Sequence, residues 1–210
     1  MVKTPRRIWL LSTVAVIVGS VLVLPYLLFD VETSRIETSS DMHYGLLVTH
    51  VLTAFIALAL GPLQFMPTVR ARRKVHRVIG RTYLLAGVVP AGLTGIPVAL
   101  LSGRLLTQIG LAIPAVLWLV TGWLAYRAAR QRDFAAHRAW MMRNYALTFL
   151  AVTARILVPL FMLAQLPFRS GVTPDQLAAD MIPVGQALSW IVNLALVEFL
   201  LRRRALEARA

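Results

Sequence analysis

Histidines and arginines beside long apolar runs are the residues of this sequence best suited to chemistry. His76 and His137 open two similar stretches, HRVIGRTY over 76–83 and HRAWMMRNY over 137–145. Both stretches continue with a second arginine and, two positions later, a tyrosine. Imidazole ligates haem iron and divalent metals. One hypothesis is therefore that His76 and His137 are the axial ligands of haem b, or two ligands of a divalent metal.

Charged side chains accompany both histidines. The arginines of the two motifs could pair with haem propionates or another anion; they are Arg77, Arg81, Arg138 and Arg143. Glu198 would complete a set of two histidines and one carboxylate, which suits non-haem iron or zinc. In the alternative, the His-Arg pairs anchor helices to anionic lipid headgroups. Glu198 would then form a salt bridge with Arg143, Arg81 or Arg202.

A second candidate site involves His50 and Arg155, which both fall inside apolar runs. Along straight helices, His50 lies about 10 Å below the outer face, and Arg155 lies about 21 Å above the inner start of its helix. The two residues would then share a depth. Placing an arginine at this depth in a membrane costs at least about 2.5 kcal/mol, so we expect its charge to have a role. Arg155 could neutralise a bound anion or polarise a ligand carbonyl. In the alternative, it bonds backbone carbonyls or extends its side chain toward the outer surface. Gln64 and Tyr83, near the inner ends of their runs, complete the candidate ligand-binding residues.

Six apolar runs carry these residues. Of the 210 residues, 58% are hydrophobic and 15% are charged, and the mean hydropathy of +0.70 is typical of membrane proteins. Each run can cross the hydrocarbon core as a helix. The first follows three basic residues but is longer than the apolar part of a signal peptide, so we expect a retained helix. The predicted spans are 8–29, 43–66, 79–101, 108–129, 141–166 and 181–201.

The lysines and arginines predict the orientation of these spans, because cytoplasmic segments carry an excess of both. With the N-terminus inside, 18 of the 22 basic residues fall in inner segments, and only Arg35, Arg104 and Arg169 fall outside. The acids Asp30, Glu32, Glu37, Asp41, Asp175 and Asp180 also fall outside. We expect a protein of the inner (cytoplasmic) membrane with both termini in the cytoplasm.

Short connections between the runs predict one all-α membrane domain over residues 1–210, with spans two to five as a four-helix core. Asn193, inside the sixth run, is expected to join helices by hydrogen bonds. The two His-Arg motifs indicate either a duplicated hairpin or convergence on the needs of an inner membrane surface.

Several longer stretches together resemble a bacterial family of predicted multi-pass membrane proteins, family 2306 of the domains of unknown function. They are HVLTAFIALALGPLQF, HRVIGRTY, HRAWMMRNYALTF with ARILVP, and NLALVE, and the likeness runs from about residue 43 to 199. The resemblance implies a membrane fold and no particular activity or cofactor. It marks the positions matched here by His50, Gln64, His76, Arg77, Gly80, Arg81, Tyr83, His137, Arg138, Trp140, Met141, Arg143, Arg155 and Glu198.

Three functions fit these residues: a haem- or metal-binding redox or respiratory accessory protein, a transporter or binder of a small anionic or lipidic ligand, and a non-catalytic membrane subunit or assembly factor. The expected partners are the bilayer, anionic headgroups at the cytoplasmic face, and a membrane protein or a second copy.

The net charge of +13 comes from basic residues between the apolar runs and not on one polar face, so it does not predict nucleic-acid binding. The sequence has no cysteine, phosphate loop or hydrolase motif, which excludes thiolate sites and argues against nucleotide-driven enzymes.

Overall fold

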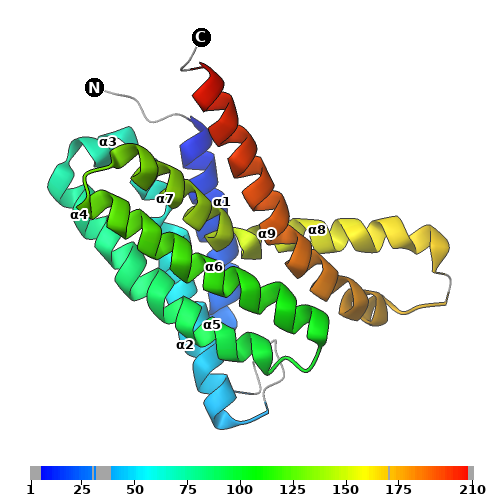
Figure 1. Ribbon diagram of the computed structural model, residues 1–210. Coiled ribbons are helices and arrows are strands. Elements are labelled where there is room, and N and C mark those ends of the chain that lie inside the picture. The colour runs from blue at the N-terminus through cyan, green and yellow to red at the C-terminus, as the bar shows by residue number, and fades with distance from the viewer. Residues whose placement is uncertain (1–5, 30, 32–38, 170, 208–210) are drawn as a thin grey trace. The chain divides into compact units, whose positions relative to one another are not determined.

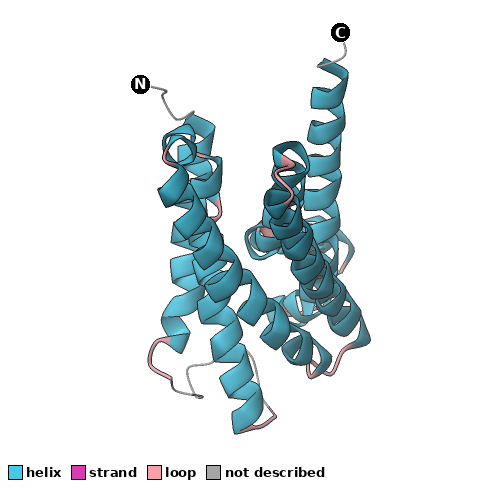
Figure 2. Cartoon of the chain, turned by 60° about the vertical axis from the view of Figure 1, so that its left-hand side comes forward, coloured by secondary structure: helices cyan, strands magenta, loops and turns pink. Residues whose placement is uncertain are grey.

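The computed structural model describes residues 6–29, 31, 39–169 and 171–207. Every regular element among them is a helix, as the colouring of Figure 2 shows. Six described segments are long and apolar enough to cross a membrane. They are Ile8–Tyr26, Asp41–Phe65, Arg73–Leu100, Leu105–Arg130, Leu150–Phe168 and Pro174–Glu207. The prediction of an all-α protein with six spans is confirmed.

The chain divides into two compact units, Met1–Leu101 and Ser102–Ala210, and each contains three of the six spans. The predicted single domain, with a core of spans two to five, extends across this division and stays a prediction. Some charges used to predict the orientation lie outside the described residues; they are Lys3, Asp30, Glu32, Arg35, Glu37 and Arg209.

Unit 1 consists of three helical spans, whose α-helices are labelled in Figure 1, and each span also contains a segment of 3-10 or π-helix. The first is α1 (Arg6–Val23) with the 3-10 turn η1 (Leu24–Tyr26), and the second is α2 (Asp41–Leu60) with η2 (Pro62–Phe65). After the short helix α3 (Pro67–Ala71), the third span runs through α4 (Arg73–Thr82), the π-helix η3 (Tyr83–Val88) and α5 (Val89–Leu100). It begins six residues before the predicted 79.

Helix α2 is the centre of unit 1, packing against α1, η3 and α5. Tyr44, Leu47 and Val48 of α2 form a buried cluster with Tyr26. A Cβ added at Gly87 of η3 would lie 2.9 Å from the backbone nitrogen of Ala57. The absence of a side chain at this position therefore lets the π-helix lie directly on the backbone of α2.

The π-helix ends just before Pro90, the second residue of α5. A proline has no N–H for an earlier carbonyl, and such a position commonly accompanies a local change of helix type. Helix continues on both sides of Pro90, so the proline does not end the span.

Unit 2 consists of four α-helices, α6 (Leu105–Arg130), α7 (Phe134–Thr148), α8 (Leu150–Gln165) and α9 (Pro174–Glu207), with the 3-10 turn η4 (Leu166–Phe168) after α8. Helix α6 packs against α7 and α9, and α8 packs mainly against α9. These four helices hold the polar side chains on which the candidate site depends.

The fifth predicted span, 141–166, is not one straight helix. The chain changes direction at Phe149, between α7 and α8 (Figure 1). The side chain of Thr148 donates to the carbonyl of Asn144 at 3.0 Å, a type of bond that often bends helices. The predicted depth of Arg155 assumed a straight helix from Met141, so that calculation does not hold; Arg155 lies in the second turn of α8.

Buried hydrogen bonds fix α6 against α7. The side-chain amide of Asn144 donates to the carbonyl of Trp118 at 2.7 Å and to the hydroxyl of Thr121 at 2.9 Å. The indole of Trp118 donates to the hydroxyl of Thr148 at 2.9 Å. All four side chains are buried. Because an unmade hydrogen bond in an apolar interior is costly, this network specifies how the two helices pack.

Candidate ligand-binding site

A cavity of about 240 Å³ lies between α8 and α9 in unit 2. Its lining residues from α8 are Ala154, Arg155, Val158 and Pro159, and those from α9 are Ile182 and Gln186. Arg155, Pro159 and Ile182 are exposed, so the cavity opens at the surface of the unit. It therefore presents one cation and one amide in otherwise apolar surroundings.

A close contact between α8 and α9 forms one border of the cavity. A Cβ added at Gly185 would overlap the side chain of Val158, which lines the cavity. Gln186, the next residue of α9, lines the cavity beside this contact. A small residue here allows the approach that interhelical packing in membranes favours.

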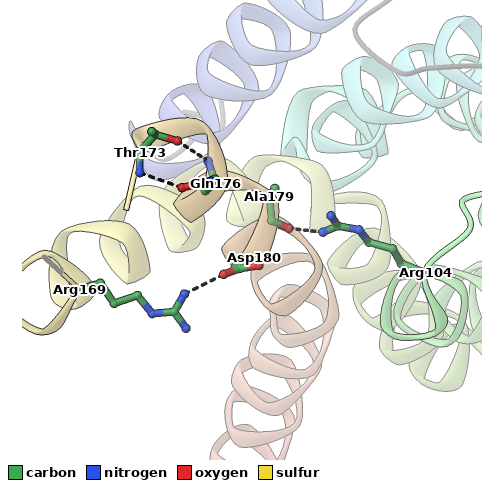
Figure 3. A network of polar contacts seen from close by, with 6 residues as sticks. All are labelled: Arg104, Arg169, Thr173, Gln176, Ala179 and Asp180. Carbon is green, nitrogen blue, oxygen red and sulfur yellow. Dashed lines mark hydrogen bonds and ion pairs between the residues drawn. The ribbon is translucent and has the colours of Figure 1, made fainter. Parts of the chain in front are cut away.

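The start of α9 is fixed by polar contacts that Figure 3 shows. The Thr173 N–H donates to Gln176 Oε1 at 3.1 Å, and the Gln176 N–H donates to Thr173 Oγ1 at 3.3 Å, which is a capping box. Arg169 pairs with Asp180 at 2.7 Å, and Arg104 donates to the carbonyl of Ala179. These contacts set the position of the turns of α9 that reach the cavity.

Two buried polar atoms on α9 have no hydrogen-bond partner among the described residues. One is Oε1 of Gln186, which lines the cavity, and the other is Nε1 of Trp190, one turn further along the helix. Buried polar atoms in native structures are nearly always paired, so each exception calls for an explanation. A polar ligand in the cavity would supply a partner for Gln186.

Next to this region, the side chain of Asn193 forms hydrogen bonds with two neighbouring helices. Its amide donates to the carbonyl of Ala146 at 3.0 Å and accepts from the hydroxyl of Thr153 at 2.8 Å. It thereby joins α7, α8 and α9, and the prediction that Asn193 holds helices together is confirmed.

Further along α9, Glu198 forms a two-pronged ion pair with Arg143 of α7. Arg143 Nε lies 2.5 Å from one carboxylate oxygen, and its Nη2 donates to the other at 3.0 Å. The guanidinium also lies 4.7 Å from the ring centre of Trp140. Of the two predicted roles of Glu198, the structure supports the salt bridge to Arg143, and both carboxylate oxygens are engaged there. In the part of the chain that the structure describes, no three His, Asp or Glu side chains gather as metal ligands.

His137, on α7, is oriented by a backbone contact. Its Nδ1 lies 2.8 Å from the carbonyl oxygen of Ala125. A carbonyl can only accept, so Nδ1 donates its proton there, and Nε2 is the ring nitrogen left for another contact. Arg138 beside it is exposed.

In unit 1, His50 has the same type of contact, with Nδ1 2.8 Å from the carbonyl oxygen of Ala91. A Cβ at Gly95 would lie 2.7 Å from that nitrogen, so only glycine leaves room for the imidazole. Gln64 is buried, and its Oε1 would lie 3.1 Å from a Cβ at Gly80 of the first His-Arg motif.

The remaining predicted residues of unit 1 are distributed along one span. His76 is half-buried on α4, Arg77 and Arg81 are exposed, and Tyr83 at the start of η3 is fully buried. The predicted pairs His76 with His137 and His50 with Arg155 each combine residues of both units, and both pairs stay predictions.

Sequence reasoning missed Gln186 and Trp190. A signal was present, since the sixth apolar run carries hydrogen-bonding side chains at 186, 189 or 190, and 193, a spacing that places them on one helix face. That Gln186 lines one cavity with Arg155 depends on how α8 crosses α9, and the residue spacing within one run does not predict this crossing.

The apolar spans and the few polar side chains inside them define a multi-pass helical membrane protein. The model of DUF2306, described as a predicted membrane protein, matches residues 47–201. Because this match covers most of the chain, the protein belongs to that family. No curated protein and no solved structure matches the chain.

Proposed function

We propose that the protein binds a single-chain amphiphile with an anionic headgroup in the cavity between α8 and α9. The observation that carries the proposal is the position of Arg155. It borders a cavity of about 240 Å³ whose opposite wall includes Gln186, a residue with a buried, unpartnered Oε1. An ionisable residue inside a membrane span is costly, and it commonly marks a substrate or ligand path.

The chemistry of the site favours an anion that also carries a hydroxyl or another donor. The guanidinium of Arg155 donates in a planar fork that matches carboxylate and phosphate oxygens. Oε1 of Gln186 accepts from a donor on the ligand. A headgroup with both features would satisfy the cation and the amide together.

The size and the borders of the cavity favour an amphiphile over a compact soluble anion. The volume lies below the range of about 300–1,000 Å³ that is usual for whole drug-sized ligands, so it suits a headgroup. Val158, Pro159 and Ile182 offer apolar contacts beside Arg155. The exposure of Pro159 and Ile182 would let an acyl chain leave the cavity into the surrounding lipid.

The test uses palmitate and lysophosphatidic acid as anionic probes and hexadecanol as the uncharged control, with the full-length protein in phosphatidylcholine nanodiscs. We expect both anions to bind and Arg155→Leu to raise their Kd at least about tenfold, since a charge-assisted hydrogen bond is lost. Arg155→Lys keeps the positive charge, so it should raise the Kd of the anions less than Arg155→Leu does. Arg132→Leu, which removes an exposed arginine outside the cavity lining, serves as the matched control.

Two results would count against the proposal. One is equal binding of the anions by wild type and Arg155→Leu, and the other is binding of hexadecanol as tight as that of palmitate. Gln186→Leu is a second variant that keeps the charge. It should lower the affinity for lysophosphatidic acid, which carries a glycerol hydroxyl, more than the affinity for palmitate.

We also propose that the protein lies in the inner (cytoplasmic) membrane with both termini in the cytoplasm, on the basis of the lysine and arginine distribution. The absence of cysteine makes a labelling test direct. In intact cells, a maleimide that does not cross membranes should label Ser102→Cys and spare Gln131→Cys, two exposed positions in loops. The reverse pattern would invert the topology.

A second candidate function is haem or metal binding through His137, and one contact favours it. Imidazoles that ligate metals usually donate their other ring N–H to a carbonyl or carboxylate, as Nδ1 of His137 does to Ala125. Protein purified after haem-supplemented expression should then show a haem absorption band that His137→Ala abolishes. An unchanged spectrum in that variant would reject His137 as a ligand.

A further inference from the structure

We infer that α4 and the turn before it form a binding surface for anionic phospholipid headgroups. This surface, here called the basic elbow, carries six cations, all exposed; they are Arg70, Arg72, Arg73, Lys74, Arg77 and Arg81. The ion pairs among the described residues lie elsewhere, at Arg143, Arg169 and Arg203. The basic elbow is thus a local excess of positive charge that no described acid compensates.

The arrangement along α4 concentrates this charge on one side. Arg73, Arg77 and Arg81 are four residues apart, so they follow one another on one helix face with a rise of about 6 Å between neighbours. Like charges at this spacing destabilise a helix. Anions placed between the guanidiniums would convert that repulsion into attraction, as the phosphates of several adjacent lipids would.

The apolar residues of α4 identify a membrane surface as the occupant. Val75 is 40% exposed and Val78 is 63% exposed, and none of the ten residues of this helix is buried. A soluble acidic partner would pair with the arginines and leave both valines in water. At a bilayer interface, phosphates and acyl chains meet at nearly the same depth, so both faces of the helix find suitable surroundings.

The position of the basic elbow in the chain supports the same occupant. Helix α4 is the first part of the span Arg73–Leu100, and the chain before it folds back through the short helix α3. The cations therefore stand at the end of a membrane-crossing helix, where anionic headgroups are concentrated. This surface lies in unit 1 and does not depend on the cavity of unit 2.

The experiment measures lipid selectivity with the full-length protein in phosphatidylcholine vesicles. Electron spin resonance gives the association of spin-labelled phosphatidylglycerol relative to spin-labelled phosphatidylcholine. We expect wild type to prefer phosphatidylglycerol, and the triple variant Arg73→Gln, Arg77→Gln, Arg81→Gln to lose at least about fivefold of that preference, because each arginine near an anionic surface contributes about that factor. Raising the salt concentration to about 1 M should weaken the wild-type preference, since the charges are exposed.

The matched control is the triple variant Arg127→Gln, Arg130→Gln, Arg132→Gln, which removes the same charge from exposed positions at the end of α6. It should keep most of the preference. An α4 variant as selective as wild type, or equal losses in the two triple variants, would overturn the inference. If the α4 variant does not fold, two other variants test the inference. Arg77→Gln alone should lose part of the preference for phosphatidylglycerol. The triple variant Arg73→Lys, Arg77→Lys, Arg81→Lys should keep that preference.

Discussion

The two His-Arg motifs begin with the same letters and end in opposite situations. In unit 2, Arg143 of the second motif forms a two-pronged ion pair with Glu198 and lies over the ring of Trp140. In unit 1, the corresponding Arg81 is exposed and belongs to a surface of six cations without a described acid. One arginine thus holds two helices together, whereas the other is available for an anion from outside the protein.

The difference shows that the contacts of the motif's arginine depend more on the neighbouring span than on the motif itself. Unit 2 brings the carboxylate of Glu198 to α7 and connects α6 to α7 through Asn144. Unit 1 instead brings backbones together at glycine, as Gly87 does on α2. Both units contain close glycine contacts, since Gly185 lies against Val158 in unit 2, so the difference lies in the polar side chains that join α7 to its neighbours.

The largest expected effect follows from close packing in unit 1. Gly87→Leu places a side chain against the backbone of Ala57, which cannot move aside as a flexible side chain does. We expect a loss of about 3 kcal/mol in the free energy of unfolding, at the upper end of the usual cost of overpacking. Unfolding in mixed micelles of dodecyl maltoside and dodecyl sulfate measures it. Gly45→Leu, where an added Cβ meets nothing within 4 Å, is the control and should unfold as wild type does.

The next effect concerns the polar network of unit 2. Asn144→Leu removes two hydrogen bonds and leaves the carbonyl of Trp118 and the hydroxyl of Thr121 without this donor. We expect a loss of about 2 kcal/mol in the free energy of unfolding, because two buried hydrogen bonds between α6 and α7 are lost. The same unfolding measurement checks it, with Thr82→Val on exposed α4 as the control. Equal stability of Asn144→Leu and wild type would mean that packing alone holds α6 on α7.

A smaller effect is expected at the ion pair of the second motif. Glu198→Gln should cost about 1 kcal/mol, since the carboxylate is partly exposed and water screens part of the attraction. Because Gln can still accept one hydrogen bond, Glu198→Ala should cost more. If both variants were as stable as wild type, Arg143 would be held mainly by Trp140.

The smallest effect should be at the first motif. Arg81→Gln is expected to change the free energy of unfolding by less than about 0.5 kcal/mol, as exposed substitutions usually do. Arg143→Gln should cost clearly more in the same assay. A large loss at Arg81 would end the contrast between the two motifs, because it would give both arginines a structural role.

Much of the fold could be predicted because the length and hydropathy of a span act locally along the sequence. Apolar runs identify spans regardless of which helices pack together. The break at Phe149 could not be predicted in this way, since it contains no proline and coincides with Thr148 bonding to Asn144 and Trp118. Arg155 therefore moved from the middle of a predicted long span to the beginning of α8.

The candidate site was predictable only in part. Arg155 stood out because an arginine in an apolar run is costly wherever that run packs. The sequence allowed Glu198 to be either a metal ligand or the salt-bridge partner of an arginine. Only the contact between α7 and α9 shows that it pairs with Arg143. The sequence did not identify Gln186, because its place beside the cavity depends on the contact between Gly185 and Val158, which belong to two different spans.

The π-helix over Tyr83–Val88 has a consequence for the phase of the third span. One residue of helix corresponds to about 100° of rotation. If the wide turn holds one residue more than an α-helical turn would, deletion of one residue within 84–88 would restore the regular period. Such a deletion would leave the arginine row of α4 facing as it does now, whereas converting the same residues to regular α-helix would turn that row by about 100° relative to the face of α5 that meets His50. The wide turn thus acts as an angular offset between a face that suits headgroups and a face that packs against protein.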